Sequence, residues 1–289
     1  MSIALAKKYA PKVDELFSAE SKLSLLTNTD YDWTGAHSVN VWNVSTVGMN
    51  DYVRNRGESF YIENGEDSVA NLSRYGNLTD LSAQVQEMLL TRDRSFIFNI
   101  DKLDQEETGE AVEAETALAR QIRERVIPEV DSYTYGKMVD NAGTTATGEL
   151  TAENIYDAIV AGTESLDDAE VPDTDRAIVV TPAVYRLMKK SPDINLEGDI
   201  SEENRLRGVI AMVDGLSVVK VPAQRLPAGF NFMICHPCAT CAPVKLEDYG
   251  IHNDTPLSSG SIVTGRVCYD AFVLNKKKKA IYCHRKNQD

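Results

Sequence analysis

The chain has 289 residues, and 43% of them are hydrophobic, which is enough apolar material for a packed core and excludes a wholly disordered chain. Its 30 basic and 44 acidic residues give a formal net charge of −14, which argues against a protein that wraps nucleic acid through a basic surface. No apolar run approaches the roughly 20 residues of a membrane-spanning helix, and the start of the chain lacks the apolar stretch of a secretory signal.

The first 36 residues are expected to form an arm with one short amphipathic helix. Pro11 suits a first helical turn, and the apolar residues Val13 and Leu16 follow it. The helix packs either on its own domain or on a neighbouring subunit, and the sequence leaves both interpretations open.

Extended segments are predicted next, over residues 39–47, 83–90 and 95–100, where β-branched and aromatic residues are frequent. The stretch 49–81 between the first two is rich in Asn, Gly, Asp, Arg and Ser. An isolated two-stranded ribbon is marginal in water, so we expect this one to pack on something outside its own domain. The third segment alternates, and its apolar face consists of Phe96, Phe98 and Ile100.

A long helix is predicted over residues 104–141, with acids at its start and bases later, an order that suits the helix dipole. At about 1.5 Å per residue it spans on the order of 57 Å, which is the length of a strut. Pro128 lacks an amide hydrogen, so we expect a kink there. One apolar stripe runs along the helix: Leu118, Ile122, Val126, Val130 and Tyr133.

Helices and strands alternate from residue 149 to residue 250. Thr151 is the expected N-cap of a helix that ends at Ala169. A buried strand over 176–180 is followed by Thr181-Pro182, which supplies a cap and a first-turn proline for a helix over 183–190.

Asp214-Gly215 predicts a type I′ turn between two strands. Further strands are expected over 216–221 and 230–235. The tail returns to β structure with a long strand over 262–274, bulged at Gly265. After a lysine-rich turn, a strand over 280–284 is expected to pair back on it.

Five cysteines all lie from Cys235 onward, and three of them repeat every third residue up to Cys241. This pattern does not predict a disulfide framework, so a reducing compartment is the simpler interpretation. Zinc usually takes four ligands from two separated pairs, and a segment extended around Pro237 would point residues three apart to opposite faces. Packing is the expected role of these thiols, and a thiolate-metal site is the alternative.

The remaining polar clusters are expected to be solvated. Asp167-Asp168, and Glu247-Asp248 with His252, would need a cleft for acid-base chemistry, and spacing alone shows none. Lys276 to Lys279 is expected to form a solvated turn or to pair with an acidic chain, with phosphate contact as the alternative. No Gly-rich phosphate loop or serine elbow is present, so we predict no cofactor, no metal and no enzymatic activity.

Several short segments follow one another along nearly the whole chain: Ala4 to Leu16, Ala117 to Arg123, Val179 to Pro182, Asp214-Gly215 with Val221-Pro222, Leu226 to Gly229, His236-Pro237 with Ala242 to Tyr249, and Gly265 to Leu274. No single segment is diagnostic, but their order together is fairly specific. In these segments the chain resembles the major capsid proteins of tailed bacteriophages that share the Hong Kong 97-type capsid fold.

The resemblance implies an α+β chain with four parts. They are an N-terminal arm (1–36), an extended β-hairpin called the E-loop (37–98), a peripheral P-domain (99–148 and 251–289) whose spine helix covers about 104–141, and an axial A-domain (149–250). In the family, the E-loop reaches over an adjacent subunit, and the A-domain loops meet around five-fold and six-fold centres.

The implied function is mechanical. Copies would assemble as hexamers and pentamers into an icosahedral head shell that encloses double-stranded DNA without sequence-specific binding, and the acidic balance suits such a shell. The implied partners are further copies, a separate scaffolding protein, a portal protein and optionally a decoration protein, with no membrane. A separate scaffold is expected because the E-loop signal begins near residue 37. The implied location is the virion, after assembly in the bacterial host cytoplasm.

Eight residues of the E-loop and the spine helix are the predicted intersubunit contacts. They are Trp42, Arg54, Arg56, Tyr61, Glu110, Glu113, Arg123 and Arg125. For Arg54→Glu combined with Arg56→Glu, we expect a soluble chain that assembles poorly.

Two other functions stay open at this point. An encapsulin-like bacterial nanocompartment shares the fold and encloses an enzyme cargo. A thiolate-metal enzyme built on Cys235 to Cys241 belongs to a different class of protein, and metal analysis would distinguish it.

Overall fold

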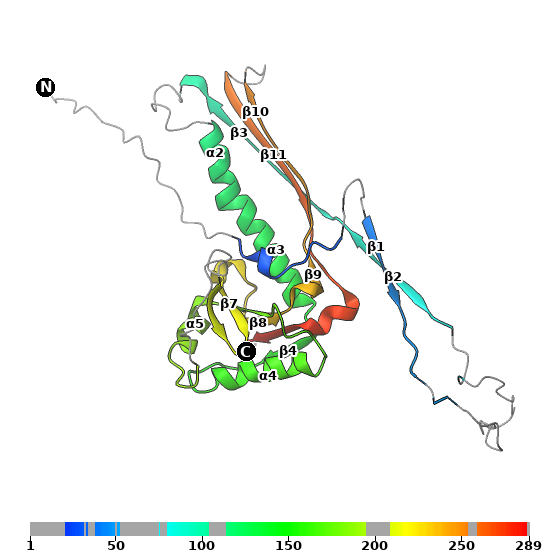
Figure 1. The fold of residues 1–289 in the computed structure, drawn as a ribbon. Helices are drawn as coiled ribbons and strands as arrows, with labels where there is room; N and C mark the ends of the chain where they lie inside the picture. The colour runs from blue at the N-terminus through cyan, green and yellow to red at the C-terminus, as the bar shows by residue number, and fades with distance from the viewer. Residues whose placement is uncertain are drawn as a thin grey trace. The chain divides into compact units, whose positions relative to one another are not determined.

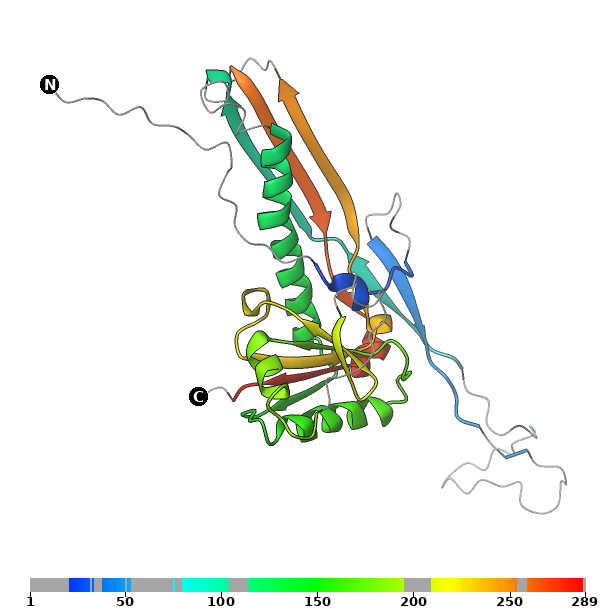
Figure 2. The same cartoon turned by 60° about the vertical axis from the view of Figure 1, so that its left-hand side comes forward.

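The structure is a computed structural model that describes residues 21–31, 33, 38–49, 51–52, 75, 80–103, 114–194, 209–253 and 259–287. The chain divides into two compact units, one of residues 40–88 and one of residues 1–39 with 89–289. The helix predicted around Pro11 lies outside the described residues. Figures 1 and 2 show the elements of each unit.

The smaller unit is built on a two-stranded ribbon. β1 (Ser38–Val44) pairs with β2 (Ala83–Leu89), as the extended patterns predict. Where the strands end, the Ser45 amide donates to the Ser82 carbonyl at 2.8 Å, and the Ser82 amide donates to Ser45 Oγ at 2.9 Å. These bonds continue the pairing of the two arms past the strands.

The third predicted strand belongs to the larger unit. β3 (Arg92–Asp101) pairs antiparallel with β11 (Gly260–Tyr269), and β11 pairs antiparallel with β10 (Val244–Asn253). An E-loop that runs to residue 98 would include β3, but the pairing assigns β3 to this three-stranded sheet. The reason is its apolar face, which alternates as predicted and packs around Ala114, Ala117 and Val263.

The bulge predicted at Gly265 does not occur. Gly265 pairs in regular register with Phe96 on β3 and with Tyr249 on β10. A Cβ atom at this position would lie 2.3 Å from Phe96 Cζ, so the glycine makes room for a phenyl ring on the neighbouring strand. The long strand is interrupted instead at Asp270, because β11 ends at Tyr269 and β12 covers only Phe272–Val273.

The long helix runs beside this sheet and comprises α2 (Ala114–Gln121), a π-helical segment η2 (Ile122–Val126) and α3 (Ile127–Asp140) (Figure 2). Residues 104–113, its predicted start, lie outside the described residues. Pro128 lies in the first turn of α3, directly after the π-helical segment. Proline donates no amide hydrogen and crowds the preceding turn, and the wider π turn accommodates it where the sequence predicts a kink.

The predicted stripe on this helix is only half-buried. The buried helix residues are Ala114, Ala117, Asp131, Thr134, Tyr135, Met138 and Val139. Sequence periodicity misses this face because its centre is polar. Asp131 accepts hydrogen bonds from Arg225 Nη1 at 2.6 Å and from Ser21 Oγ at 2.7 Å, and these bonds allow a carboxylate to be buried there.

The second sheet of the larger unit has six strands in the order β4-β13-β8-β5-β7-β6. Their bounds are Thr144–Thr147, Ile281–Arg285, Phe230–Cys235, Ala177–Val180, Leu216–Lys220 and Val209–Val213. The strands predicted over 176–180, 216–221 and 230–235 are confirmed.

The C-terminal strand differs from the prediction. β13 does not pair back on β11; it lies between β4, to which it is parallel, and β8, to which it is antiparallel. Residues 281–284 are all buried, as expected for an inner strand that is covered on both faces of its sheet. Part of the segment predicted for the P-domain (251–289) therefore shares a sheet with the segment predicted for the A-domain.

Two helices cover one face of the six-stranded sheet. α4 (Ile155–Asp167) begins after Asn154, later than predicted; Thr151 Oγ1 still accepts from the Asn154 amide at 3.3 Å, as a capping residue does, in the turn before the helix. α5 (Pro182–Met188) is capped as predicted, because Thr181 Oγ1 accepts from the Val184 amide at 3.2 Å. The turn at Asp214-Gly215 is confirmed by positive φ angles of 49° and 74°.

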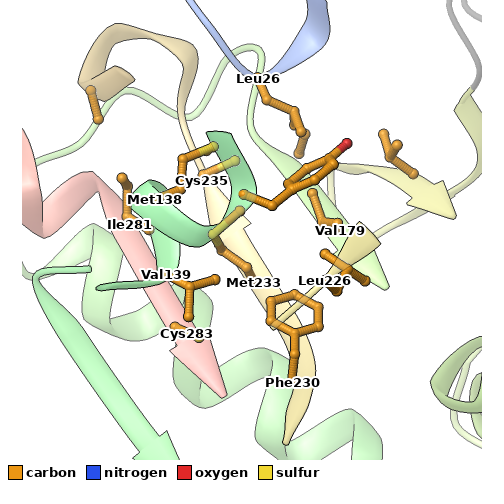
Figure 3. Packing of buried hydrophobic residues seen from close by; sticks show 14 of the residues in the cluster. Leu26, Met138, Val139, Val179, Leu226, Phe230, Met233, Cys235, Ile281 and Cys283 are labelled. Atoms are coloured by element: carbon orange, nitrogen blue, oxygen red, sulfur yellow. The ribbon is translucent and has the colours of Figure 1, made fainter. Parts of the chain in front are cut away.

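The sheet separates two apolar clusters. Ile155 and Ile159 of α4, Val184 and Met188 of α5, and Phe232 of β8 belong to one cluster. The other cluster lies against α3 and the N-terminal segment, and Figure 3 shows its members Leu26, Met138, Val139, Met233 and Cys235. From Phe232 to Cys235, successive residues of β8 enter opposite clusters, so this strand lies at the centre of a three-layer body.

Candidate functional site

The ribbon exposes an unusual amount of apolar surface. Within the described residues, eight of the fourteen large exposed hydrophobic side chains lie in the unit of residues 40–88. They are Trp42, Val44, Val47, Met49, Tyr52, Tyr75, Leu81 and Val85. Exposed apolar side chains gathered in one unit are typical of surfaces that contact another protein.

The chain just before β3 is held by a buried carboxylate, that of Asp270. Asp270, which is buried between β11 and β12, accepts from the Thr91 amide at 2.9 Å and from Thr91 Oγ1 at 2.7 Å. Its other oxygen accepts from Tyr133 OH and from the Ala271 amide, both at 2.8 Å. These four bonds tie the start of β3 to α3, and sequence reasoning missed them because no local pattern marks Asp270.

A shallow cationic groove adjoins this anchor. Arg92 lies 4.6 Å and Lys137 Nζ 5.5 Å from the centre of the Tyr133 ring. The groove has a volume of about 580 Å³, and Ser132, Gly136 and the carboxylate of Asp140 also line it. Two cations beside an aromatic face suit an acidic side chain.

The predicted contact residues fall into two groups. Trp42 is 68% exposed on β1, and Arg123 and Arg125 are exposed on the π-helical segment of the long helix. The other five, Arg54, Arg56, Tyr61, Glu110 and Glu113, lie outside the described residues.

The cysteine segment is not extended as predicted. β8 ends at Cys235, and a 3₁₀ turn, η4 (Pro237–Ala239), follows before the short strand β9 (Thr240–Cys241). Burial raises the pKa of Cys235 to about 12 and also raises the pKa values of Cys238 and Cys241. These thiols therefore stay protonated at neutral pH in the metal-free chain, a state that suits packing and not nucleophilic attack.

The other polar clusters have structural partners. Asp167 accepts from the buried Arg176 at 2.6 Å, and the His252 ring lies 3.2 Å from Thr264 Oγ1. Lys276 to Lys279 lie in a 3₁₀ turn, η5 (Asn275–Ala280). Within the described ranges, no three His, Cys, Asp or Glu side chains are grouped to hold a metal, and no helix is long and apolar enough to cross a membrane.

No protein-family model matches the sequence, and no curated protein is similar to it at a significant level. Solved structures do match. The structure of Mycobacterium phage Che8 is 17% identical, with a TM-score of 0.72 over 97% of this chain and 96% of that one. The mature capsid of bacteriophage PhiM1 is 15% identical, with a TM-score of 0.70 over 99% and 93%.

The capsid of the cyanophage P-SCSP1u is 14% identical and also has a TM-score of 0.70, over 98% of this chain and 93% of that one. Identities this low establish the fold alone. The fold is that of phage capsid proteins.

Proposed function

We propose that this chain is the major capsid protein of a tailed phage, whose copies close an icosahedral shell around double-stranded DNA. The observation that carries the proposal is the exposed apolar ribbon on a capsid fold. Full burial of an exposed large apolar side chain contributes roughly 1.5–3 kcal/mol, and the eight side chains of the ribbon unit, which are at least 45% exposed, would each add part of this to association.

In this proposal the ribbon is the E-loop, which packs over an adjacent copy, and the long helix is the spine helix of the P-domain. The six-stranded sheet with α4 and α5 forms the A-domain. Two of its six strands, β4 and β13, come from segments outside 149–250. Hexamers and pentamers of the chain assemble with a separate scaffolding protein and a portal, and optionally a decoration protein. Assembly takes place in the host cytoplasm, and the final location is the virion.

The Asp270 anchor supports the same proposal. A ribbon that must reach a neighbour needs a fixed point of departure, and the four hydrogen bonds of Asp270 supply one at Thr91. The negative net charge fits a container for DNA that does not bind it tightly. The raised thiol pKa values weigh against the metal-enzyme alternative.

The test is assembly of the purified chain with its candidate scaffold, viewed by negative-stain electron microscopy. We expect closed shells for the wild type and about ten-fold or lower particle yield for Trp42→Ser, which removes a large exposed apolar group. Trp42→Phe keeps an apolar ring and should retain most of the yield. Chains that stay monomeric with every scaffold would refute the proposal, and particles filled with an enzyme cargo instead of DNA would indicate a nanocompartment.

A further inference from the structure

Acidic and basic residues lie in separate segments of the part of the chain that forms the six-stranded sheet and its helices. Residues 153–175, which include α4 and the loop after it, contain eight carboxylates and no lysine or arginine. Residues 177–190, which include β5 and α5, contain three cations and no carboxylate. Neighbouring segments of one small body thus carry opposite charge.

Most of these carboxylates lack a cationic partner. The buried Arg176 pairs with Asp167 at 2.6 Å and with Asp173 at 2.8 Å. The other six are exposed and form no ion pair within the part of the chain that the structure describes. We call these six the acidic face: Glu153, Asp157, Glu164, Asp168, Glu170 and Asp175.

The cations gather around one aromatic ring. Lys189 Nζ lies 5.1 Å and Lys220 Nζ 5.5 Å from the centre of the Tyr185 ring. Arg186 and Lys190 are exposed beside them, and none of the four cations forms an ion pair with a described residue. We call Arg186, Lys189, Lys190 and Lys220 the basic face. Asp193 is the nearest acid in sequence, and Glu149 lines the same groove as Arg186, so four cations face two carboxylates and the balance stays positive.

The fold places the two faces apart. α4 lies over β13 and β8, since a Cβ on Gly162 would be 2.7 Å from Ile234 Cδ1 and 2.9 Å from Tyr282 Cδ1. Tyr185 lies near Lys220 at the end of β7, on the other half of the sheet. The acidic loop precedes the first residue of β5, whereas α5 follows its last. Figure 1 shows α4 along the lower rim of the sheet and α5 at its side.

We propose that the basic face of one copy binds the acidic face of the next copy in a head-to-tail contact. This inference rests on the proposed function and names the partner surface within a capsomer. A contact between two different surfaces repeats from copy to copy and closes into a ring when the rotation fits. A two-fold contact would instead place the basic face of one copy against the basic face of another. Such a contact sets cation against cation, which costs free energy.

The test uses charge reversal on exposed residues, so that the fold is preserved. Lys189→Glu with Lys190→Glu reverses part of the basic face, and Asp168→Lys with Glu170→Lys reverses part of the acidic face. We expect each pair of changes to weaken ring formation about ten-fold, measured by mass photometry in low salt. Lys277→Glu with Lys279→Glu makes the same change in net charge as the basic-face variant, but outside both faces, and should leave ring formation intact.

Two rescue experiments make the test specific. A chain with all four substitutions carries both faces reversed and should form rings again. An equimolar mixture of the two reversed chains should also associate, because unlike copies can alternate. Strict alternation closes a ring of six but not a ring of five, so we expect the mixture to form hexamers without pentamers.

The outcomes separate this inference from the proposed function. Wild-type shells together with wild-type yield from both reversed chains would overturn the head-to-tail contact and leave the capsid function standing. Failure of both rescues would also overturn it, and so would closed dimers in place of rings. A wild-type chain that forms no shell at all would refute the proposed function itself and this inference with it.

Discussion

Two ion pairs of the same chemistry lie in opposite environments. Asp131 and Arg225 are 2% and 7% exposed, whereas the side chains of Asp93 and Arg266 are 48% and 57% exposed. Burial raises the pKa of Asp131, and the hydrogen bond from Ser21 and the charge of Arg225 oppose that shift. The hydrogen bond from Arg266 lowers the pKa of Asp93. The shortest N···O distance is 2.6 Å in both pairs, but the cost of losing one partner differs.

The prediction at this scale is therefore a contrast. Asp131→Ala removes the carboxylate that the buried Arg225 cation contacts at 2.6 Å and should lower the free energy of unfolding by about 3–5 kcal/mol, measured by urea denaturation. Asp93→Ala removes an exposed pair that water replaces, so its change should be close to the error of the measurement. Equal losses for the two variants would contradict this account of the buried pair.

At the scale of elements, local signals predict more than pairing partners do. The cap at Thr181, the Asp214-Gly215 turn and the buried run of β5 depend on neighbouring residues alone, and all three are confirmed. The neighbours of β3 and β13 were missed because register between distant strands leaves no local pattern. The buried face around Asp131 was missed because a polar residue breaks the apolar periodicity.

Gly265 provides a prediction on strand packing. Gly265→Val places a side chain where the Phe96 ring lies, and overpacking of this kind should destabilise the protein by about 1–3 kcal/mol. Thermal unfolding measures the loss, and Phe96→Ala in the same chain should recover part of it.

Gly136 is the matched control within α3. A Cβ atom there meets nothing within 4 Å, so Gly136→Ala should stabilise the protein by up to about 1 kcal/mol through helix propensity. A Gly265→Val variant as stable as the wild type would show that the Phe96 ring does not need this space.

At the scale of the whole molecule, the sequence predicts the exposed ribbon but does not predict the hydrogen bonds of Asp270 just before β3. The ribbon follows from β-branched and aromatic residues in two separated runs. The anchor joins Thr91, Tyr133 and Asp270, which are far apart in the chain and match no motif. A site assembled by tertiary contacts from ordinary residue types cannot be found from spacing alone.

Removal of the ribbon tip tests whether stability depends on the larger unit and assembly on the ribbon. With residues 46–81 replaced by a short glycine-containing turn, we expect an unchanged thermal midpoint, because the cores of the larger unit are outside the deletion. The same chain should form no closed shells under the microscope. A large drop in the midpoint would instead mean that the ribbon stabilises the body, and normal shells would mean that assembly does not need it.

The position of β13 has a consequence for synthesis on the ribosome. Every other strand of the six-stranded sheet precedes it in the chain, yet β4 pairs with β13 alone and β8 depends on it along one side. Nascent chains therefore expose an open sheet until residues 281–285 emerge. Because domains fold as units, a ribosome-bound fragment lacks the finished body that a neighbour would recognise. In the proposed shell, a chain that lacks β13 is therefore expected not to take part in assembly.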